Sequence, residues 1–511
     1  MNVITCNNIT KCFKLGKVTY KSLSSISFEI EKGLLVGLIG PDGSGKGVLL
    51  QILAGLVRPD DGKATVLGFD TVKEAQKIQD VIGYMPQKFG LYENLTLAEN
   101  LKLYAELHKV PEDVQKERAE KLLKIMNLER FPDRFAGKLS GGMKQKLALA
   151  CALISEPEVM LLSDPSVGVD VVSRHELWNI LKQVTKEQDT TILVTTSYMD
   201  EADFCDKVLV MLENKIIAYD KPEAIREKAA KFVENPTFEH GFQVLVKGKV
   251  LPRLTREKKY DPNGEVLVHA SNLVKRFGNF TAVDHTSFDI HKGEIFGLLG
   301  ANGAGKTTTF RMLCNLDPAT EGEVRICGLD LKNSSSEARN KFGFVAQKFS
   351  LYTDLTVKEN MEFFSGAYGL YGRKQKERID WAVKEFNLQQ YIDYQTSDLT
   401  LGIKQSLSMA CALMHEPELL FLDEATSGAD PITRRDFWKR IISLADSGVT
   451  IIITTHFLDE AEYCDNMIIM QDGKAVAQGR VEDIIKAGTE NGNIPHNLEQ
   501  AFINLIKRRE E

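Results

Sequence analysis

The sequence repeats itself after about 260 residues, and this repeat constrains the fold more than any other feature. Residues in similar local contexts stand 260 or 259 positions apart, namely Lys46 and Lys306, Gln87 and Gln347, Ser140 and Thr400, and Ser197 and His456. A fixed period over nearly the whole chain predicts two copies of one structural unit with almost no insertions between them.

Each copy ends on a similar short amphipathic segment, Phe238–Phe242 in the first and Leu498–Phe502 in the second. We therefore predict a first domain at residues 1–246 and a second at residues 265–511, which suits a chain of 511 residues. Residues 247–264 are charged and contain two prolines and two glycines. They are predicted to form a flexible linker whose basic residues are solvated.

The pattern within each copy predicts an α/β fold. Short apolar runs bounded by polar turns are typical of buried parallel strands, and they occur at Val159–Leu162, Ile192–Val194, Leu419–Leu422 and Ile451–Ile453. Residues 96–107 instead have helical periodicity. We expect a mostly parallel sheet flanked by helices in each copy, with a helical insert between Gln87 and Ser140 and between Gln347 and Thr400.

The second copy contains a complete phosphate-binding loop of the P-loop type at Gly300–Thr307. An apolar run at Ile295–Leu299 precedes the loop and a predicted helix at Thr308–Leu313 follows it, which is the context such a loop requires. Backbone N–H groups and the helix dipole favour an anion there, while Lys306 can reach the outer phosphates and Thr307 can bind Mg²⁺. The predicted phosphate-binding residues are Gly300, Asn302, Gly303, Ala304, Gly305, Lys306, Thr307 and Thr308.

Two carboxylates, Asp423 and Glu424, follow the apolar run at Leu419–Leu422. Open α/β sheets bind their ligands at the carboxyl ends of strands. Asp423 is predicted to hold Mg²⁺, and Glu424 to orient or deprotonate an attacking water. Adjacent acids alone are more often a turn, but the phosphate loop and His456 favour the catalytic interpretation.

Residues Leu139–Gln145 read LSGGMKQ and are similar to the signature motif of the ATP-binding-cassette family. The resemblance covers both copies and also rests on the loop at Gly300 and on Gln347, Asp423, Glu424, Asp430 and His456. It implies two tandem ATPase cassettes with ATP and Mg²⁺ as cofactors. The roles it implies are catalysis by Glu424, His456 and Gln347, and Mg²⁺ binding by Thr307, Gln347 and Asp423.

In that family two cassettes pair head to tail, and each ATP lies between the phosphate loop of one and the signature of the other. The resemblance therefore assigns Ser140, Gly141 and Gly142 to the ATP bound by the second cassette's loop. A helix that starts at this point directs its N-terminus toward a phosphate. Phe280 and Tyr20 stand where the family places an aromatic residue that stacks on adenine, although either could belong to a strand core.

The two copies differ at the positions that carry this chemistry. The first has Gly47 in place of Thr307 and Ser197 in place of His456. At the offset of 260, Ser163 replaces Asp423 and Asp164 replaces Glu424, although a local slip could make Asp164 the metal ligand. The second copy's own signature is altered instead, with Leu401 where the backbone must approach phosphate.

Head-to-tail pairing would collect every intact group in one composite site and every substitution in the other. We therefore predict one hydrolytic site and one degenerate site, with unlinked drift as the competing explanation. The residues of the predicted degenerate site are Tyr20, Gly40, Gly43, Gly45, Lys46, Gly47, Gln87, Ser163, Asp164 and Ser197.

Charge and composition narrow the choice of partners. The formal charge of −7 disfavours nucleic acid as a partner. The eight cysteines form no C-x-x-C pair, which favours buried thiols in a reducing compartment. No N-terminal signal segment is visible, and no apolar stretch approaches the ~20 residues that span a bilayer. We expect a cytoplasmic protein that works at a membrane through a partner.

Residues 88–96 and 348–356 look like the corresponding regions of drug-export ATPases. The resemblance implies a fused ATPase subunit of a multidrug-type exporter, peripheral to the cytoplasmic face of the membrane, that energises one or more integral membrane permease subunits. Phe89, Tyr92, Phe349 and Tyr352 are candidate coupling residues. The alternatives are a soluble twin-cassette translation factor that acts on ribosomes and a protein that binds ATP without turnover.

Overall fold

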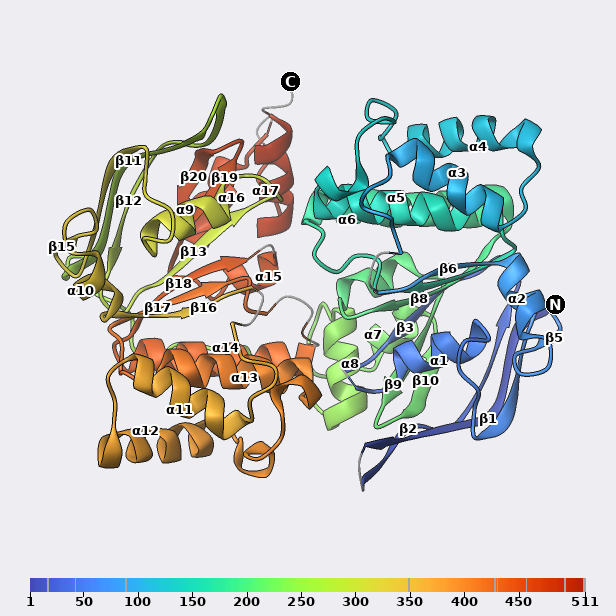
Figure 1. The fold of residues 1–511 in the computed structure, drawn as a ribbon, viewed down its shortest axis with the longest axis horizontal. Helices are drawn as coiled ribbons and strands as arrows, with labels where there is room; N and C mark the ends of the chain where they lie inside the picture. Colours follow the sequence, from blue (N-terminus) through green and yellow to red (C-terminus); the bar gives the residue numbers. More distant parts are fainter. Residues whose placement is uncertain are drawn as a thin grey trace. The chain divides into compact units, whose positions relative to one another are not determined.

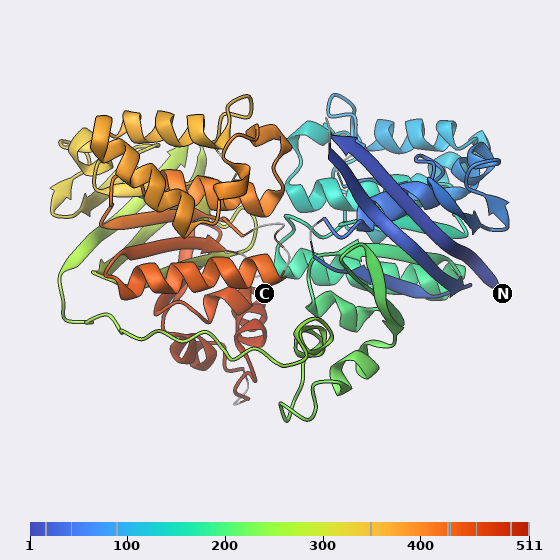
Figure 2. The same ribbon diagram turned by 90° about the horizontal axis from the view of Figure 1, so that it is seen from below.

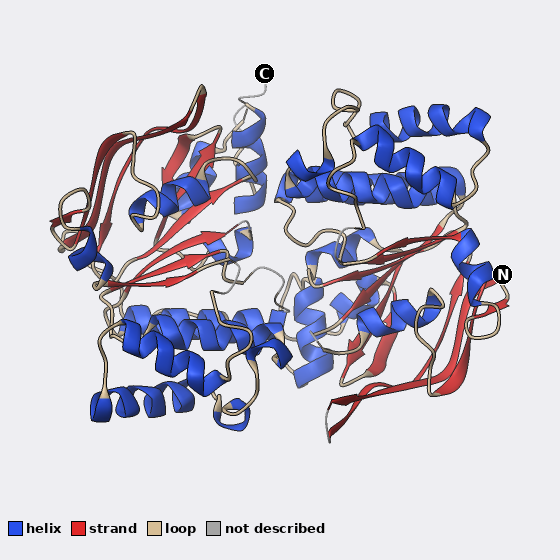
Figure 3. Cartoon of the chain, viewed as in Figure 1, coloured by secondary structure: helices blue, strands red, loops and turns tan. Residues whose placement is uncertain are grey.

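The computed structural model describes residues 1–511 except 16–17, 42, 88–89, 348–349, 427–428, 430, 456, 491–492 and 509–511. The chain forms two compact units, which contain most of residues 1–252 and most of residues 253–511 respectively (Figure 1). Each unit combines two β-sheets with helices (Figure 3).

The larger sheet of each unit has six strands. In the first unit they are β3 (Leu35–Ile39), β6 (Ile82–Met85), β7 (Val159–Ser163), β8 (Thr191–Thr196), β9 (Lys207–Leu212) and β10 (Lys215–Asp220). In the second they are β13 (Ile295–Gly300), β16 (Phe342–Val345), β17 (Leu419–Asp423), β18 (Thr450–Thr455), β19 (Asn466–Gln471) and β20 (Lys474–Gly479).

The strand orders are β10-β9-β3-β8-β7-β6 and β16-β17-β18-β13-β19-β20, so the two sheets have the same topology. Among these described strands the pairs are parallel, apart from the terminal hairpins β9/β10 and β19/β20. The prediction of a mostly parallel sheet is confirmed.

Both faces of this sheet are buried, which explains the unbroken apolar runs. Successive side chains of a strand point to opposite faces. In β13, Ile295 and Leu299 join one core cluster, whereas Phe296 and Leu298 join another on the opposite face. β3 divides its residues in the same way.

A second, four-stranded antiparallel sheet in each unit was not predicted. Its strands are β1 (Asn2–Leu15), β2 (Val18–Glu31), β4 (Asp61–Val66) and β5 (Phe69–Asp70), and their counterparts β11 (Val266–Phe277), β12 (Phe280–His291), β14 (Glu321–Ile326) and β15 (Leu329–Asp330). The long hairpins contain several register shifts, such as the one between Cys6 and Ile9. Bulges of this kind interrupt the period-2 alternation by which strands are recognised in a sequence.

The helices of the first unit are α1 (Lys46–Leu53), α2 (Ala75–Val81), α3 (Leu97–Leu107), α4 (Glu112–Ile125), α5 (Gly141–Leu153), α6 (Val171–Gln188), α7 (Pro222–Glu227) and α8 (Phe238–Lys247). Those of the second are α9 (Lys306–Leu313), α10 (Ser335–Arg339), α11 (Val357–Ala367), α12 (Gly372–Glu385), α13 (Leu401–Ala412), α14 (Pro431–Asp446), α15 (Leu458–Ala461), α16 (Val481–Ala487) and α17 (Leu498–Lys507).

The predicted helical inserts are present as α3 with α4 and as α11 with α12. Thr96 caps α3 through a reciprocal capping box with Glu99, and Thr356 caps α11 with Glu359 in the same way. Within the described part of the chain, no helix is both long and apolar enough to cross a membrane. Six of the eight cysteines are buried, as expected, while Cys12 and Cys327 are half-buried.

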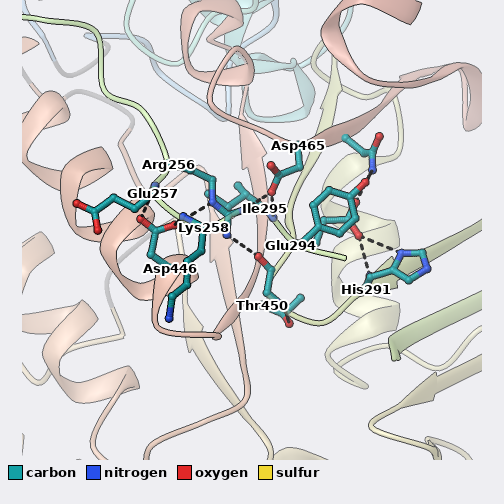
Figure 4. Close-up of polar contacts among 12 residues, drawn as sticks. Arg256, Glu257, Lys258, His291, Glu294, Ile295, Asp446, Thr450 and Asp465 are labelled. Atoms are coloured by element: carbon teal, nitrogen blue, oxygen red, sulfur yellow. Dashed lines mark hydrogen bonds and ion pairs between the residues drawn. The ribbon is translucent and has the colours of Figure 1, made fainter. Parts of the chain in front are cut away.

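The segment between α8 and β11 contains no described helix or strand (Figure 2). The prediction that its basic residues are solvated is wrong for Arg256, whose side chain is only 9% exposed. Its guanidinium lies 3.3 Å from Asp446, forms an ion pair with Asp465 and donates to the Gly293 carbonyl at 2.9 Å (Figure 4). Arg256 therefore fixes this part of the segment to the second unit.

Candidate functional site

The phosphate loop of the second unit connects β13 to α9, so the predicted strand and helix are both confirmed. Gly303 and Gly305 have φ of 84° and 100°, in the left-handed region that favours glycine. A Cβ on Gly305 would lie 2.5 Å from the Ala282 carbonyl oxygen, and one on Gly300 would lie 2.3 Å from that of Met470. Glycine at these positions is a packing requirement.

Lys306 lies over this loop with 3% of its surface exposed. Its Nζ donates to the carbonyl oxygens of Gly300 at 2.7 Å and Ala301 at 2.9 Å. Burial lowers the pKa of Lys306, and the carboxylates of Glu424 and Asp423 oppose that shift. The ammonium group is thus held at the loop, close to two acids. Asn302 and Thr307 are exposed, Thr308 is half-buried and Ala304 is buried.

Asp423 is the last residue of β17, and Glu424 follows it with a left-handed φ of 44°. Thr454 on the neighbouring strand β18 holds both residues. Its hydroxyl donates to Asp423 Oδ1 at 2.6 Å and accepts from the Glu424 backbone N–H at 2.9 Å. Burial raises the pKa of Asp423, and the bond from Thr454 opposes the rise.

Gln347 lies two residues beyond β16, and its Nε2 donates to Glu424 Oε2 at 2.7 Å. The fold therefore brings Lys306, Gln347, Asp423 and Glu424 together at the carboxyl ends of parallel strands of one sheet. The predicted catalytic residue His456 lies outside the described residues. Asp430 and the candidate coupling residues Phe89 and Phe349 also lie outside them.

The aromatic residues proposed to stack on adenine are exposed. Phe280 at the start of β12 is 64% exposed and Tyr20 on β2 is 48% exposed. The Tyr20 hydroxyl donates to the Gly43 carbonyl of the first phosphate loop at 2.8 Å. The alternative that either ring belongs to a strand core is therefore wrong, and their role with adenine stays a prediction.

The signature motif of the first unit starts a helix, as expected. Ser140 is the N-cap of α5, and its hydroxyl accepts from the Met143 N–H at 3.3 Å. Gly141 and Gly142 are the first two residues of the helix. In the second unit Thr400 precedes α13 without a side-chain cap bond, and Leu401 is the first helical residue with 37% exposure.

The phosphate loop of the first unit keeps its backbone. Gly43 and Gly45 have φ of 77° and 94°, and Lys46 Nζ donates to the carbonyls of Gly40 at 2.5 Å and Pro41 at 3.0 Å. Gly47 is exposed, and a Cβ built there meets no atom within 4 Å. The described part of the first loop thus keeps the glycine conformations and the lysine contacts of the second, but Gly47 lacks the hydroxyl of Thr307.

The structure also resolves the ambiguity at Ser163 and Asp164. Ser163 ends β7 and pairs with Thr195, as Asp423 ends β17 and pairs with Thr454. Asp164 has a φ of 47° and its N–H donates to the Thr195 hydroxyl at 2.9 Å, which repeats the geometry of Glu424. Asp164 therefore occupies the place of Glu424, and the alternative of a local slip is wrong. Burial raises the pKa of Asp164, while Lys46 opposes the rise.

Two other predicted residues of the first unit lie near strand ends. Gln87 is exposed just beyond β6, and Ser197 is buried just beyond β8. Sequence reasoning missed Thr454 and Thr195, which fix the carboxylates. A signal was present, because both copies read Thr-Thr at the end of an apolar run, at Thr195–Thr196 and Thr454–Thr455.

Comparisons with known proteins agree with this geometry. A family model described as ABC transporter matches residues 23–167 and 283–427. The chain is 43% identical to the probable multidrug ABC transporter ATP-binding protein YbhF of Escherichia coli, over 99% of this chain and 98% of that protein.

Two further relatives match different shares of this chain. A putative ABC transporter ATP-binding protein of Caldanaerobacter subterraneus is 30% identical, over 91% of this chain and 89% of its own. The Nod factor export ATP-binding protein I of Ralstonia nicotianae is 38% identical over 43% of this chain and 68% of its own.

Proposed function

Because this chain belongs to the ABC transporter family, we propose that it is the ATP-hydrolysing subunit of a membrane exporter with one competent and one degenerate composite ATP site. The observation that carries the proposal is the distribution of intact groups. The nucleotide-binding side is complete in the second cassette, where Gln347 contacts Glu424, whereas the helix-capping signature is complete in the first at Ser140.

The competent site consists of the loop at Gly300–Thr307 from one cassette and Ser140–Gly142 from the other. Phe280 supplies an aromatic face for adenine. The donors that would hold Mg²⁺ are the Thr307 hydroxyl, Gln347 and Asp423, and Mg²⁺ prefers such oxygen ligands. Mg²⁺ would neutralise charge on the phosphates, while Glu424 and His456 act on the attacking water.

The degenerate site consists of the loop at Gly40–Gly47 and the altered signature at Thr400–Leu401. Its backbone and Lys46 suit phosphate, and the Tyr20 hydroxyl is bonded to the loop at Gly43. Gly47 and Ser163 lack the groups that hold Mg²⁺ in the other cassette. We expect this site to bind nucleotide weakly, with little dependence on Mg²⁺ and without turnover.

The partner is one or more integral membrane permease subunits, which hold the protein at the cytoplasmic face of the membrane. One relative is named a multidrug ABC transporter protein, and the name of another, a Nod factor export protein, favours export. Tyr92 and Tyr352 are 55% and 48% exposed near the helical inserts and are candidates for contact with the permease. The formal charge of −7 disfavours nucleic acid as a partner.

Purification from detergent-solubilised membranes tests the partner. The expected result is co-purification with an integral membrane protein and ATPase activity that depends on Mg²⁺. Sedimentation with ribosomes, and absence from the membrane fraction, would instead support the translation-factor alternative.

A further inference from the structure

A buried acid, Glu460 on α15, contacts the end of strand β18, which carries Thr454 and Thr455. Glu460 is 1% exposed, and its Oε2 accepts from the Thr455 hydroxyl at 2.7 Å. The same hydroxyl accepts from the Phe457 backbone N–H at 3.0 Å. Glu460 therefore fixes the two residues that flank position 456 in the sequence.

A cation accompanies this buried acid. Burial raises the pKa of Glu460, and Arg434 on α14 opposes the rise. Arg434 also lies 3.1 Å from Asp459, and its guanidinium lies over the Phe457 ring with a separation of 4.4 Å from the centroid. Glu460, Arg434 and Phe457 thus join α14 to the segment after β18.

The strand end that Glu460 holds also carries the threonine that holds the two carboxylates. On the other side of the strand end, Thr454 holds Glu424 and Asp423. The adjacent threonines of β18 therefore connect the carboxylates to Glu460.

The first unit contains an equivalent network, in which Glu201 and Thr196 take the places of Glu460 and Thr455. Glu201 is fully buried, accepts from the Ser166 hydroxyl at 2.9 Å and is bonded to the Thr196 hydroxyl. The Thr196 hydroxyl accepts from the Tyr198 N–H at 2.9 Å, and Arg174 lies over the Tyr198 ring. The residue between Thr196 and Tyr198 is Ser197, whereas the residue between Thr455 and Phe457 is His456.

We propose that Glu460 is a positioning residue for ATP hydrolysis, which holds Thr455 and Phe457 at the end of β18 and so supports the adjacent Thr454, which holds Asp423 and Glu424. It acts through Thr455 and not by direct contact with nucleotide. The inference rests on the proposed function, in which hydrolysis takes place at the loop of the second cassette. The equivalent Glu201 serves a site without turnover, so its contribution is to folding alone.

The test compares Glu460→Gln with Glu201→Gln in the complete chain, assayed for ATPase activity, ATP binding and melting temperature. Misplacement of groups by a distant substitution can lower a rate by about 100-fold. We expect Glu460→Gln to lower kcat by about 10- to 100-fold with KM within about threefold, and Glu201→Gln to leave kcat within about twofold. Equal losses of kcat would show a purely structural role, and an unchanged kcat in Glu460→Gln would also overturn the proposal.

A second set of variants covers the case in which Glu460→Gln fails to fold. Thr455→Val removes the hydroxyl that joins Glu460 to Phe457 and should lower kcat, whereas Thr455→Ser should restore it. Thr196→Val is the matched control and should leave kcat unchanged; a loss equal to that of Thr455→Val would contradict the proposal. Glu424→Gln is measured alongside, because turnover retained there would refute the proposed site itself and not the role of Glu460.

Discussion

Gln347 and Glu424 are joined by a hydrogen bond of 2.7 Å from Nε2 to Oε2, although they are 77 residues apart in the sequence. One residue follows β16 and the other follows β17, and these strands are parallel neighbours. The bond fixes the carboxylate at the edge of the sheet where Lys306 also lies. It orients the group that we assign to the attacking water.

Glu424→Gln should abolish ATP turnover while ATP binding persists, because the amide keeps the size of the side chain but cannot accept a proton. A general base contributes about 10²- to 10⁴-fold to a rate, so we expect at least a 100-fold loss of kcat. The measurement is steady-state ATPase activity together with equilibrium ATP binding. Asp164→Asn is the control at the equivalent backbone position, and an equal loss there would contradict the assignment of one hydrolytic site.

Ser140→Arg and Thr400→Arg test the head-to-tail arrangement. Both residues precede the first turn of a helix, α5 or α13, so each substitution places a long charged side chain at the same local position. If Ser140 completes the competent site, Ser140→Arg should lower ATPase activity at least about tenfold and Thr400→Arg much less. The reverse ranking would refute the pairing.

The Mg²⁺ dependence of ATP binding should rest in part on the Thr307 hydroxyl, which the first loop lacks. Thr307→Gly should weaken Mg²⁺-dependent ATP binding at the second loop, as chelation of Mg²⁺ with EDTA should in the unmodified chain. Gly47→Thr adds the hydroxyl to the first loop, where a Cβ meets no atom within 4 Å, so the fold should tolerate it. Nucleotide titrations with and without Mg²⁺ measure both changes, and a Thr307→Gly protein with undiminished Mg²⁺ dependence would remove Thr307 from the metal site.

Arg256→Ala should destabilise the second unit. The substitution leaves Asp446 and Asp465, which are 16% and 15% exposed, without their shared cation. Loss of one partner from such a buried group lowers the free energy of unfolding by about 3 to 5 kcal/mol. Arg253→Ala is the control, because Arg253 is 64% exposed in its pair with Glu462 and should contribute less than about 1 kcal/mol. Chemical denaturation distinguishes the two, and similar effects would show that Arg256 does not anchor the segment.

His415 should make the second unit sensitive to acid. Its ring stacks on Tyr368 with centroids 3.7 Å apart, and burial lowers the pKa of His415 to about 4. Since the unfolded chain takes up this proton near pH 6.5 and the folded chain does so only near pH 4, the free energy of unfolding should fall as the pH drops through that window. The first cassette has Ser155 at the equivalent position. His415→Ser should make the free energy of unfolding, measured by denaturant at several pH values, depend less steeply on pH between 6.5 and 4. The same pH dependence in the variant and the unmodified chain would contradict this role of His415.

Local patterns in the sequence were sufficient to predict the strands and helices that form the core of each cassette. The strand, loop and helix around Lys306 are contiguous, and the apolar runs that became β17 and β18 are buried on both faces. The antiparallel sheets were missed because bulges in β1 and β11 interrupt the alternation of buried and exposed residues.

The sequence alone determined the duplication, the phosphate loops and the unequal distribution of Thr307, Asp423 and Glu424, because each motif is a short contiguous run that can be compared directly between the two copies. Only the tertiary structure decided that Thr454 holds Glu424 across 30 residues and that Arg256 pairs with Asp465 across 209. Such contacts form when strands become neighbours in a sheet or when a segment returns to a folded unit. Their partners are therefore set by topology, which no local spacing in the sequence records.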